Sequence, residues 1–292
     1  YSFDWCMIAF SLGPIHIYRY GIMYALTFVS GYLFLMQIQK RWWFRAYPAL
    51  DNFIAQYLDT FIITAMLGIM IGGRVGHILI YDLSYFIAHP LQILAINKWG
   101  MSFIGGIIGE IVAMTLLIMR YNRRHAGWDT SQRLSPLLLL DMMMPIIPFG
   151  IFLGRFANFL NQEIYWLVVP ADAWWLSSWL VNVLISTNFF HVYDKIDTML
   201  RLNTNFLSMI GEWLIVGGVV WYFFISRRLD KRLAVWQLSA IFLLSYSMIR
   251  FFFEYLRQDS QAEFVRAFTK SQWFFVGFFI FCIGFLCRKR RK

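Results

Sequence analysis

The sequence predicts an all-α polytopic membrane protein with seven transmembrane helices and an interfacial arm on the outer side. Hydrophobic residues make up 60% of the chain, aromatic residues 20% and charged residues only 14%. The mean hydropathy is +0.57. Apolar stretches recur, each close to the roughly 20 residues that a helix needs to cross a bilayer core. Cationic residues follow every second stretch. These features indicate a chain whose main solvent is lipid.

Seven apolar stretches are long enough to cross the hydrocarbon core of a bilayer. They lie at 20–38, 58–82, 101–119, 137–154, 206–226, 233–256 and 271–287. Pro145 and Pro148 interrupt the fourth stretch, so we expect a kinked or partly unwound helix there. No long linker, low-complexity segment or internal repeat separates the stretches. Residues 1–292 are therefore expected to form a single transmembrane domain.

Cationic residues predict the orientation of the chain, because Lys and Arg in short loops favour the cytoplasmic side. Sixteen of the 26 Lys and Arg residues follow the first, third, fifth and seventh stretches. We therefore expect the N-terminus outside and the C-terminus in the cytoplasm. The net charge of +10 then reflects topology and attraction to anionic lipid. The RKRRK tail is interpreted as a stop signal, and no nucleic-acid partner is expected.

The segment 160–205 is the one sizeable extramembrane stretch of the predicted topology. It is rich in Trp, at positions 166, 174, 175 and 179. Amphipathic aromatic residues favour the membrane surface. Two interpretations stay open, an interfacial aromatic belt and an arm that gates lateral entry of a lipid or a membrane-tethered peptide.

A polar cluster, GRFANFLNQE at 154–163, ends the fourth apolar stretch. An Arg or Glu in hydrocarbon costs on the order of 3 kcal/mol, so several together normally face a cavity, a ligand or one another. If the helix continues, Asn158, Gln162 and Glu163 share one broad arc with Arg155, whereas Asn161 turns aside. One face of this helix is predicted to be polar.

Small residues at every fourth position predict close helix packing in the second and third stretches. They are Gly68, Gly72, Gly76, Gly105 and Gly109. Such faces usually mean helix contact. Arg74 lies on the first of them, within GGRVG, so an alternative is a small polar pocket beside a buried cation.

The sixth stretch carries Arg250, Glu254 and Arg257 on one helical face. Their spacing fits an internal salt-bridge ladder at the membrane edge, or a functional site. Together with Arg74 and Arg155, these guanidinium groups suit an anionic head group, because their forked donors bind phosphate in a bidentate way and stay charged. The residues alone thus predict an outward-opening site that binds a phospholipid or another anion. They do not indicate which reaction, if any, takes place there.

The run DMMMPIIPFGIFLGRFANFLNQE at 141–163 resembles the signature of the prolipoprotein diacylglyceryl transferase family. Further similar motifs occur in the family's order. They are YRYGIMY at 18–24, Asp59, GGRVG at 72–76, MSF-x-GG at 101–106 and IRFFFEYLRQD at 249–259. The resemblance covers most of the chain, and the family also has seven spans with the N-terminus outside.

The resemblance implies transfer of the diacylglyceryl group from phosphatidylglycerol to the thiol of a lipobox cysteine in a prolipoprotein, with release of glycerol phosphate. It assigns Arg155 and Arg250 as the catalytic pair that grips the phosphate. The further residues expected to bind substrate are Tyr20, Arg74, Asn158, Asn161, Glu163 and Glu254. No metal or cofactor is called for. The expected setting is the bacterial inner membrane, as a multi-pass monomer.

Several positions depart from the family pattern. Ile104 occupies the place of a family His proposed as a catalytic base or site-former, and isoleucine cannot accept a proton. A family Gln-Leu-Tyr-Glu run corresponds to NFLSMIGE, which keeps only the later Glu212. His77 and Glu110 are gains. Three hypotheses follow: an active transferase, a catalytically impaired relative that binds phospholipid or precursor, and a lipid or anion transporter, which the lack of inverted repeats disfavours.

Overall fold

The structure, a computed structural model, describes residues 8–12, 15–40, 47–80, 83–89, 102–125, 133–161, 168, 185, 190–192, 200–230, 235–254, 264–265 and 268–289. The chain divides into two compact units. Unit 1 is Tyr1–Gly31 with Leu140–Lys292, and unit 2 is Tyr32–Leu139. Each is considered by itself below, and the single-domain interpretation stays a prediction.

The described residues are mainly helical. The helices are α1 (Arg19–Lys40), α2 (Pro48–Ile80), α3 (Leu83–Ala88), α4 (Phe103–Arg124), α5 (Pro136–Met143), α6 (Ile147–Asn161), α8 (Thr204–Gly211), the π-helical turn η3 (Glu212–Val216), α9 (Gly217–Asp230), α10 (Gln237–Glu254) and α11 (Lys270–Lys289). Short antiparallel pairs join β1 (Ile8–Leu12) to β2 (Ile15–Tyr18), β3 (Phe190–Val192) to β4 (Leu200–Leu202), and β5 (Phe264–Val265) to β6 (Phe268–Thr269).

All seven apolar stretches coincide with helices among the described residues. By length and composition, three of these helical segments could cross a membrane, Arg19–Lys40, Pro48–Leu79 and Asn205–Ser226. The bent pair α5 and α6 makes a fourth if it forms one span. The mainly helical character and the presence of apolar helices long enough to span a membrane are confirmed, whereas the count of seven spans stays a prediction. Most of the expected arm at 160–205 lies outside the described residues.

The expected break in the fourth stretch is present. Helices α5 and α6 meet at 55° across residues 144–146. Pro145 lies in this break, where its missing N–H costs no helical hydrogen bond. Pro148 occupies the first turn of α6, a position whose N–H has no intrahelical partner in any case.

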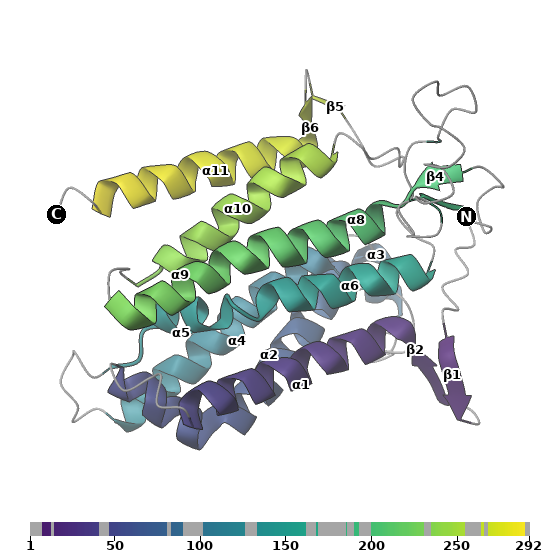
Figure 1. Cartoon of the computed structure of the whole chain (residues 1–292). Coiled ribbons are helices and arrows are strands. Elements are labelled where there is room, and N and C mark those ends of the chain that lie inside the picture. The colour runs from purple at the N-terminus through teal and green to yellow at the C-terminus, as the bar shows by residue number, and fades with distance from the viewer. Residues whose placement is uncertain are drawn as a thin grey trace. The chain divides into compact units, whose positions relative to one another are not determined.

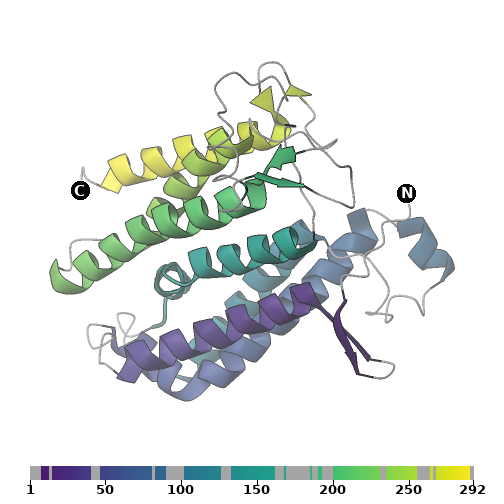
Figure 2. The same cartoon turned by 45° about the vertical axis from the view of Figure 1, so that its right-hand side comes forward.

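In unit 1 the first half of α1, then α6, the α8–η3–α9 rod, α10 and α11 lie side by side in that order (Figures 1 and 2). Two glycines show how closely α6 approaches the helices on either side of it. A Cβ placed on Gly150 would lie 2.8 Å from Thr27 Cγ2, and one on Gly217 would lie 3.5 Å from Pro148 Cβ. Helix α6 is therefore held between α1 and the α8–η3–α9 rod.

Asp141, the first residue of the signature run, caps a helix. Its side chain is fully buried and accepts hydrogen bonds from the backbone N–H of Trp236 at 2.7 Å and of Ser239 at 2.9 Å. The Ser239 hydroxyl donates to the same carboxylate. A carboxylate at a helix N-terminus satisfies donors that have no intrahelical partner. These bonds also hold Trp236 at a φ of 74°, a left-handed conformation that bulky residues rarely adopt.

In unit 2 the glycine faces pack α2 against α4, as the spacing predicts. A Cβ on Gly72 would lie 2.6 Å from Gly109 Cα, and one on Gly109 would lie 2.6 Å from Gly72 Cα. The two backbones are thus in contact, which only glycine allows. The helix contact is confirmed.

Helix α2 begins ten residues before the stretch predicted at 58–82. Hydropathy alone missed this first segment, because its polar residues belong to an amphipathic helix. Asn52 donates from Nδ2 to the hydroxyl of Tyr121, which donates to the carbonyl of Ala49. Phe53 is fully buried and meets Tyr121 edge to face, with ring centroids 5.1 Å apart. This added segment anchors α2 to the end of α4.

We predict that Gly109→Ala lowers the free energy of unfolding by about 2 kcal/mol or more, because the new methyl group must separate two backbones. Gly106→Ala, on the same helix, is the matched control. Its Cβ would meet Ile69 at an ordinary 3.6 Å. The control should be neutral or stabilise the helix by up to about 1 kcal/mol. Unfolding in mixed micelles measures both, and equal effects would contradict the packing argument.

Candidate functional site

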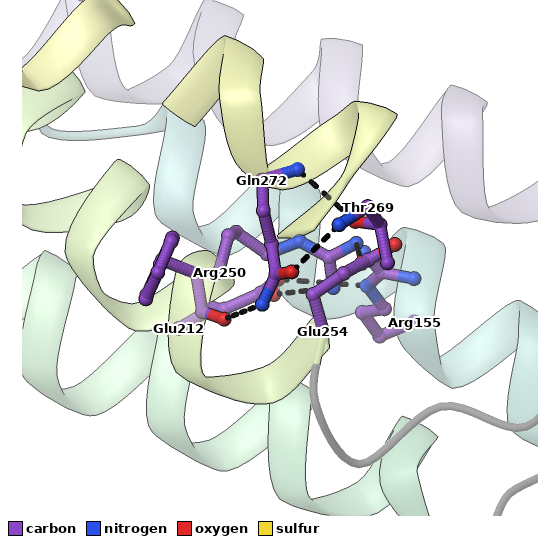
Figure 3. Close-up of polar contacts among 7 residues, drawn as sticks. Arg155, Glu212, Arg250, Glu254, Thr269 and Gln272 are labelled. Carbon is purple, nitrogen blue, oxygen red and sulfur yellow. Dashed lines mark hydrogen bonds and ion pairs between the residues drawn. The ribbon is translucent and has the colours of Figure 1, made fainter. Parts of the chain in front are cut away.

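Two guanidinium groups from distant parts of the sequence share one carboxylate in unit 1. Arg155 on α6 donates from Nε to Glu212 Oε2 at 3.5 Å, and Arg250 on α10 donates from Nη1 to Glu212 Oε1 at 3.2 Å. The Glu212 side chain is fully buried. Figure 3 shows the side chains meeting from α6, η3 and α10. Arg155 and Arg250, which the resemblance expects to grip one phosphate, thus meet around an acid.

Further polar groups complete this guanidinium cluster. Arg250 Nη2 lies 3.8 Å from Glu254 Oε2, so the predicted contact within the sixth stretch is present, while Arg257 lies outside the described residues. Tyr246 lies within electrostatic reach of Arg155, Glu212 and Arg250. The Nε of Arg250 is buried and has no hydrogen-bond partner among the described residues. One strong donor of the cluster is therefore unsatisfied in the described part of the chain.

Among the described residues, the positive and negative charges of the cluster are equal in number. Arg155 and Arg250 contribute two positive charges, and Glu212 and Glu254 contribute two negative charges. The guanidinium groups expected at an anionic head group are thus paired with carboxylates, because burying two unpaired cations would cost more than pairing them. An anion that binds here must share the guanidinium donors with the carboxylates.

The local fold fixes the acidic and basic side chains on short elements. Glu212 begins the π-helical turn η3, an irregularity that often occurs at functional sites. The last turn of α10, which carries Arg250 and Glu254, is held by the start of α11. There Thr269 and Gln272 form a capping box, and Gln272 Nε2 donates to the carbonyl of Phe251 at 3.2 Å (Figure 3).

The C-terminal end of α6 is tied to the start of α1. The hydroxyl of Tyr20 donates to Asn158 Oδ1, and Arg19 donates to the carbonyl of Leu160. A cation at the last carbonyl groups of a helix interacts favourably with them. Tyr20 and Asn158 therefore meet directly, and the Nδ2 group of Asn158 is the part left to face another partner.

The remaining residues expected to bind substrate fall in different places. Asn161 ends α6 and is 1% exposed, and its Oδ1 has no hydrogen-bond partner among the described residues. Glu163 lies outside the described residues. Arg74 belongs to unit 2, where it is buried with its guanidinium carbon 5.1 Å from the ring centre of Phe86. His77 meets the same ring edge to face.

Sequence reasoning did not place Glu212 and Tyr246 in the site. A signal for Glu212 existed, since it is the only acid in the apolar segment 205–226. An ionisable residue within a span is expected to be functional and to have a partner. Tyr246 gave no such signal, because tyrosine is common in membrane helices. In the part of the chain that the structure describes, no group of three or more His, Cys, Asp and Glu side chains could hold a metal ion.

Comparison with known proteins decides the family. A family model described as prolipoprotein diacylglyceryl transferase matches residues 7–288. This chain belongs to the prolipoprotein diacylglyceryl transferase family. Members of this transferase family are membrane proteins, in agreement with the apolar helices of the chain.

Curated relatives agree over most of the chain. A phosphatidylglycerol–prolipoprotein diacylglyceryl transferase of Aromatoleum aromaticum is 31% identical over 97% of this chain and 95% of its own length. The protein of the same name from Dechloromonas aromatica is 31% identical over 91% of this chain and 88% of its own. That of Coxiella burnetii is 33% identical over 88% of this chain and 84% of its own length.

Ile104, which occupies the place of the family His, lies in the first turn of α4.

We predict that Glu212→Ala lowers the free energy of unfolding by about 3–5 kcal/mol, because it leaves two buried guanidinium groups without their shared acid. Glu212→Gln should cost less, since its carbonyl oxygen still accepts a hydrogen bond from one of them. Denaturant unfolding of the purified protein in mixed micelles measures both. An alanine variant as stable as the parent would show that the cluster does not hold the helices together.

Proposed function

We propose that this chain transfers the diacylglyceryl group of phosphatidylglycerol to the thiol of a lipobox cysteine in prolipoproteins and releases glycerol phosphate. The observation that carries the proposal is the convergence of Arg155 and Arg250 on one buried acid, with Arg250 Nε left without a partner among the described residues. The family and the names of the curated relatives support the same reaction.

The chemistry requires donors at the phosphate. The cysteine sulfur attacks the glycerol carbon, the bond from that carbon to the phosphate oxygen breaks, and its electron pair stays on the phosphate. The leaving group gains negative charge as the bond breaks, and the thiol proton passes to water or to another group at the site. Two fixed guanidinium groups can stabilise this developing charge without reorganisation. Arg155 and Arg250 are the proposed catalytic pair, and Glu212 sets their spacing.

The other site residues have proposed supporting roles. Tyr20 holds Asn158 at the end of α6, and Asn158, Asn161 and Glu163 surround the head group. Glu254 orients Arg250 from the next helical turn. Arg74 is also proposed to bind substrate. No metal or cofactor takes part in the proposed reaction.

The proposed setting is the bacterial inner membrane. The chain crosses it seven times as a single transmembrane domain and a monomer, with the N-terminus outside and the C-terminus in the cytoplasm. The segment 160–205 is proposed to lie on the outer surface. This orientation places the site toward the outer leaflet, where secreted precursors arrive.

One observation favours a second candidate function. Ile104 cannot accept a proton where the family pattern has a His, so a relative that binds phospholipid or precursor without turnover is the alternative. General-base assistance is typically worth about 10² to 10⁴ in rate. Its loss slows the reaction but leaves the guanidinium cluster intact.

We predict that the purified protein, given phosphatidylglycerol and a lipobox peptide, forms a thioether-linked diacylglyceryl peptide that mass spectrometry detects. Arg155→Lys should reduce the rate by about 10² or more, because lysine keeps the charge but loses the planar fork. Arg120→Lys, at an exposed position on α4, is the matched control and should leave the rate unchanged. Product formation that survives Arg155→Lys within a factor of about two would refute the role of this guanidinium.

We predict that Ile104→His raises the rate more at pH 7 than at pH 9. A free thiol has a pKa of about 8.5, so the base matters most where little thiolate is present. Ile104→Leu is the control and should have no effect. Product formed by the histidine variant alone, and never by the parent chain, would establish the second candidate function instead.

A further inference from the structure

Helix α3 packs into unit 2 through a single side chain, that of Phe86. Among the six residues of α3, Phe86 alone is buried, with an exposed fraction of 6%. The other large side chains of this helix are between 46% and 72% exposed; they are Leu83, Tyr85 and Ile87. The contact of α3 with the rest of the unit therefore depends on the ring of Phe86.

The face of this ring lies beneath a cation. The guanidinium carbon of Arg74, on α2, is 5.1 Å from the ring centre. This distance is within the roughly 6 Å at which the face of an aromatic ring attracts a cation. Arg74 is itself buried, so water screens the attraction little. His77, one turn further along α2, meets the same ring edge to face with centroids 6.4 Å apart. Phe86 is thus a shared support for two neighbouring side chains of α2.

The backbone on either side of Arg74 is fixed by helix α4. The carbonyl of Gly73 accepts a hydrogen bond from the backbone N–H of Ser102 at 2.8 Å. A Cβ placed on Gly76 would lie 2.5 Å from Gly105 Cα, so the two backbones are in contact there. The long side chain of Arg74 starts from this fixed backbone, and Phe86 contacts its far end. Together these contacts define where the guanidinium lies.

An aromatic ring stabilises a buried cation in a different way from an acid. At the guanidinium cluster, Glu212 supplies a negative charge, and an incoming anion must compete with it. The ring of Phe86 attracts a cation through its quadrupole and carries no net charge. The contact itself therefore cancels none of the positive charge of Arg74, and the guanidinium can still attract an anion.

We propose that Phe86 is a positioning residue, which holds the guanidinium of Arg74 in the orientation that binds the phosphate of phosphatidylglycerol. This inference rests on the proposed function, in which Arg74 binds substrate. Phe86 acts through Arg74 and touches no reacting atom. Loss of the ring therefore weakens binding of the lipid and leaves the chemical step unchanged, so the Michaelis constant rises while kcat stays the same.

The test compares a variant that loses the ring with one that keeps it. Phe86→Leu stays apolar but has no ring face, whereas Phe86→Tyr retains the face. With purified protein in mixed micelles, Phe86→Leu should raise KM for phosphatidylglycerol about 10-fold. Its kcat and its KM for the lipobox peptide should stay within about two-fold of the parent values. Phe86→Tyr should restore KM for the lipid to within about three-fold. A leucine variant with unchanged KM for the lipid would overturn the inference.

A double-mutant cycle tests whether the effect passes through Arg74. In an Arg74→Leu chain, adding Phe86→Leu should change KM for phosphatidylglycerol by less than about two-fold, because the partner of the ring is already gone. A 10-fold rise that persists in the Arg74→Leu chain would show that Phe86 acts by packing alone and would overturn the inference. Where Phe86→Leu fails to fold, Phe86→Met provides a second apolar side chain without a ring.

Phe61→Leu is the matched control for packing. Phe61 is also buried in unit 2, on α2, and its ring meets that of Phe53 at 6.1 Å. The same substitution there removes a buried ring without removing the support of Arg74. It should leave KM for phosphatidylglycerol within about two-fold of the parent value. An equal rise in KM for Phe61→Leu and Phe86→Leu would overturn the positioning role.

A binding measurement distinguishes failure of this inference from failure of the proposed function. If the parent chain transfers no lipid, the proposed function fails, and the rise in unfolding temperature on adding phosphatidylglycerol then tests the position of Arg74. Phe86→Leu should reduce this rise, and Phe61→Leu should not. Equal rises in the parent chain and both variants, equal reductions in both variants, or no rise in any chain would refute the inference.

Discussion

The buried carboxylate of Glu212 is the contact on which the site of this transferase-family chain depends. It joins Arg155 on α6 to Arg250 on α10 and begins a π-helical turn between them. Because an unpaired charge in a low-dielectric interior is far more costly than a paired one, this acid allows two guanidinium groups to approach. Without it, like charges would hold the helices apart, and the phosphate donors would have no fixed spacing.

Neutrality gives the cluster a second property. Two guanidinium groups and two carboxylates need no bound ion to be stable in the resting protein. In the proposed reaction the guanidinium groups are already oriented when the phosphate ester gains charge, and some of their hydrogen bonds pass from the carboxylates to the phosphate. Preorganised donors of this kind stabilise developing charge without reorganisation at the moment of reaction. The acids thus set the geometry of Arg155 and Arg250, the pair proposed to bind the phosphate.

Helix caps and side-chain hydrogen bonds, rather than long apolar contacts, hold the elements around the cluster in place. Asp141 caps the start of α10, and the capping box of Thr269 and Gln272 holds its end. Tyr20 fastens Asn158 to the first turn of α1. In lipid, where apolar burial gives little drive for helix association, such bonds and glycine contacts decide which helices meet.

The sequence by itself determined the lipid solvent, the helical stretches, the break at Pro145 and the glycine contact of α2 with α4, because hydropathy and backbone chemistry act locally. The pairing of Arg155 with Arg250 was expected from the family resemblance alone. Only the tertiary structure decided that Arg155 and Arg250 meet on Glu212 and that Tyr20 meets Asn158. Such pairings depend on the register of helices distant in sequence, which no periodicity within one helix contains. The pairing of charges likewise follows from burial, which is a property of the packed fold.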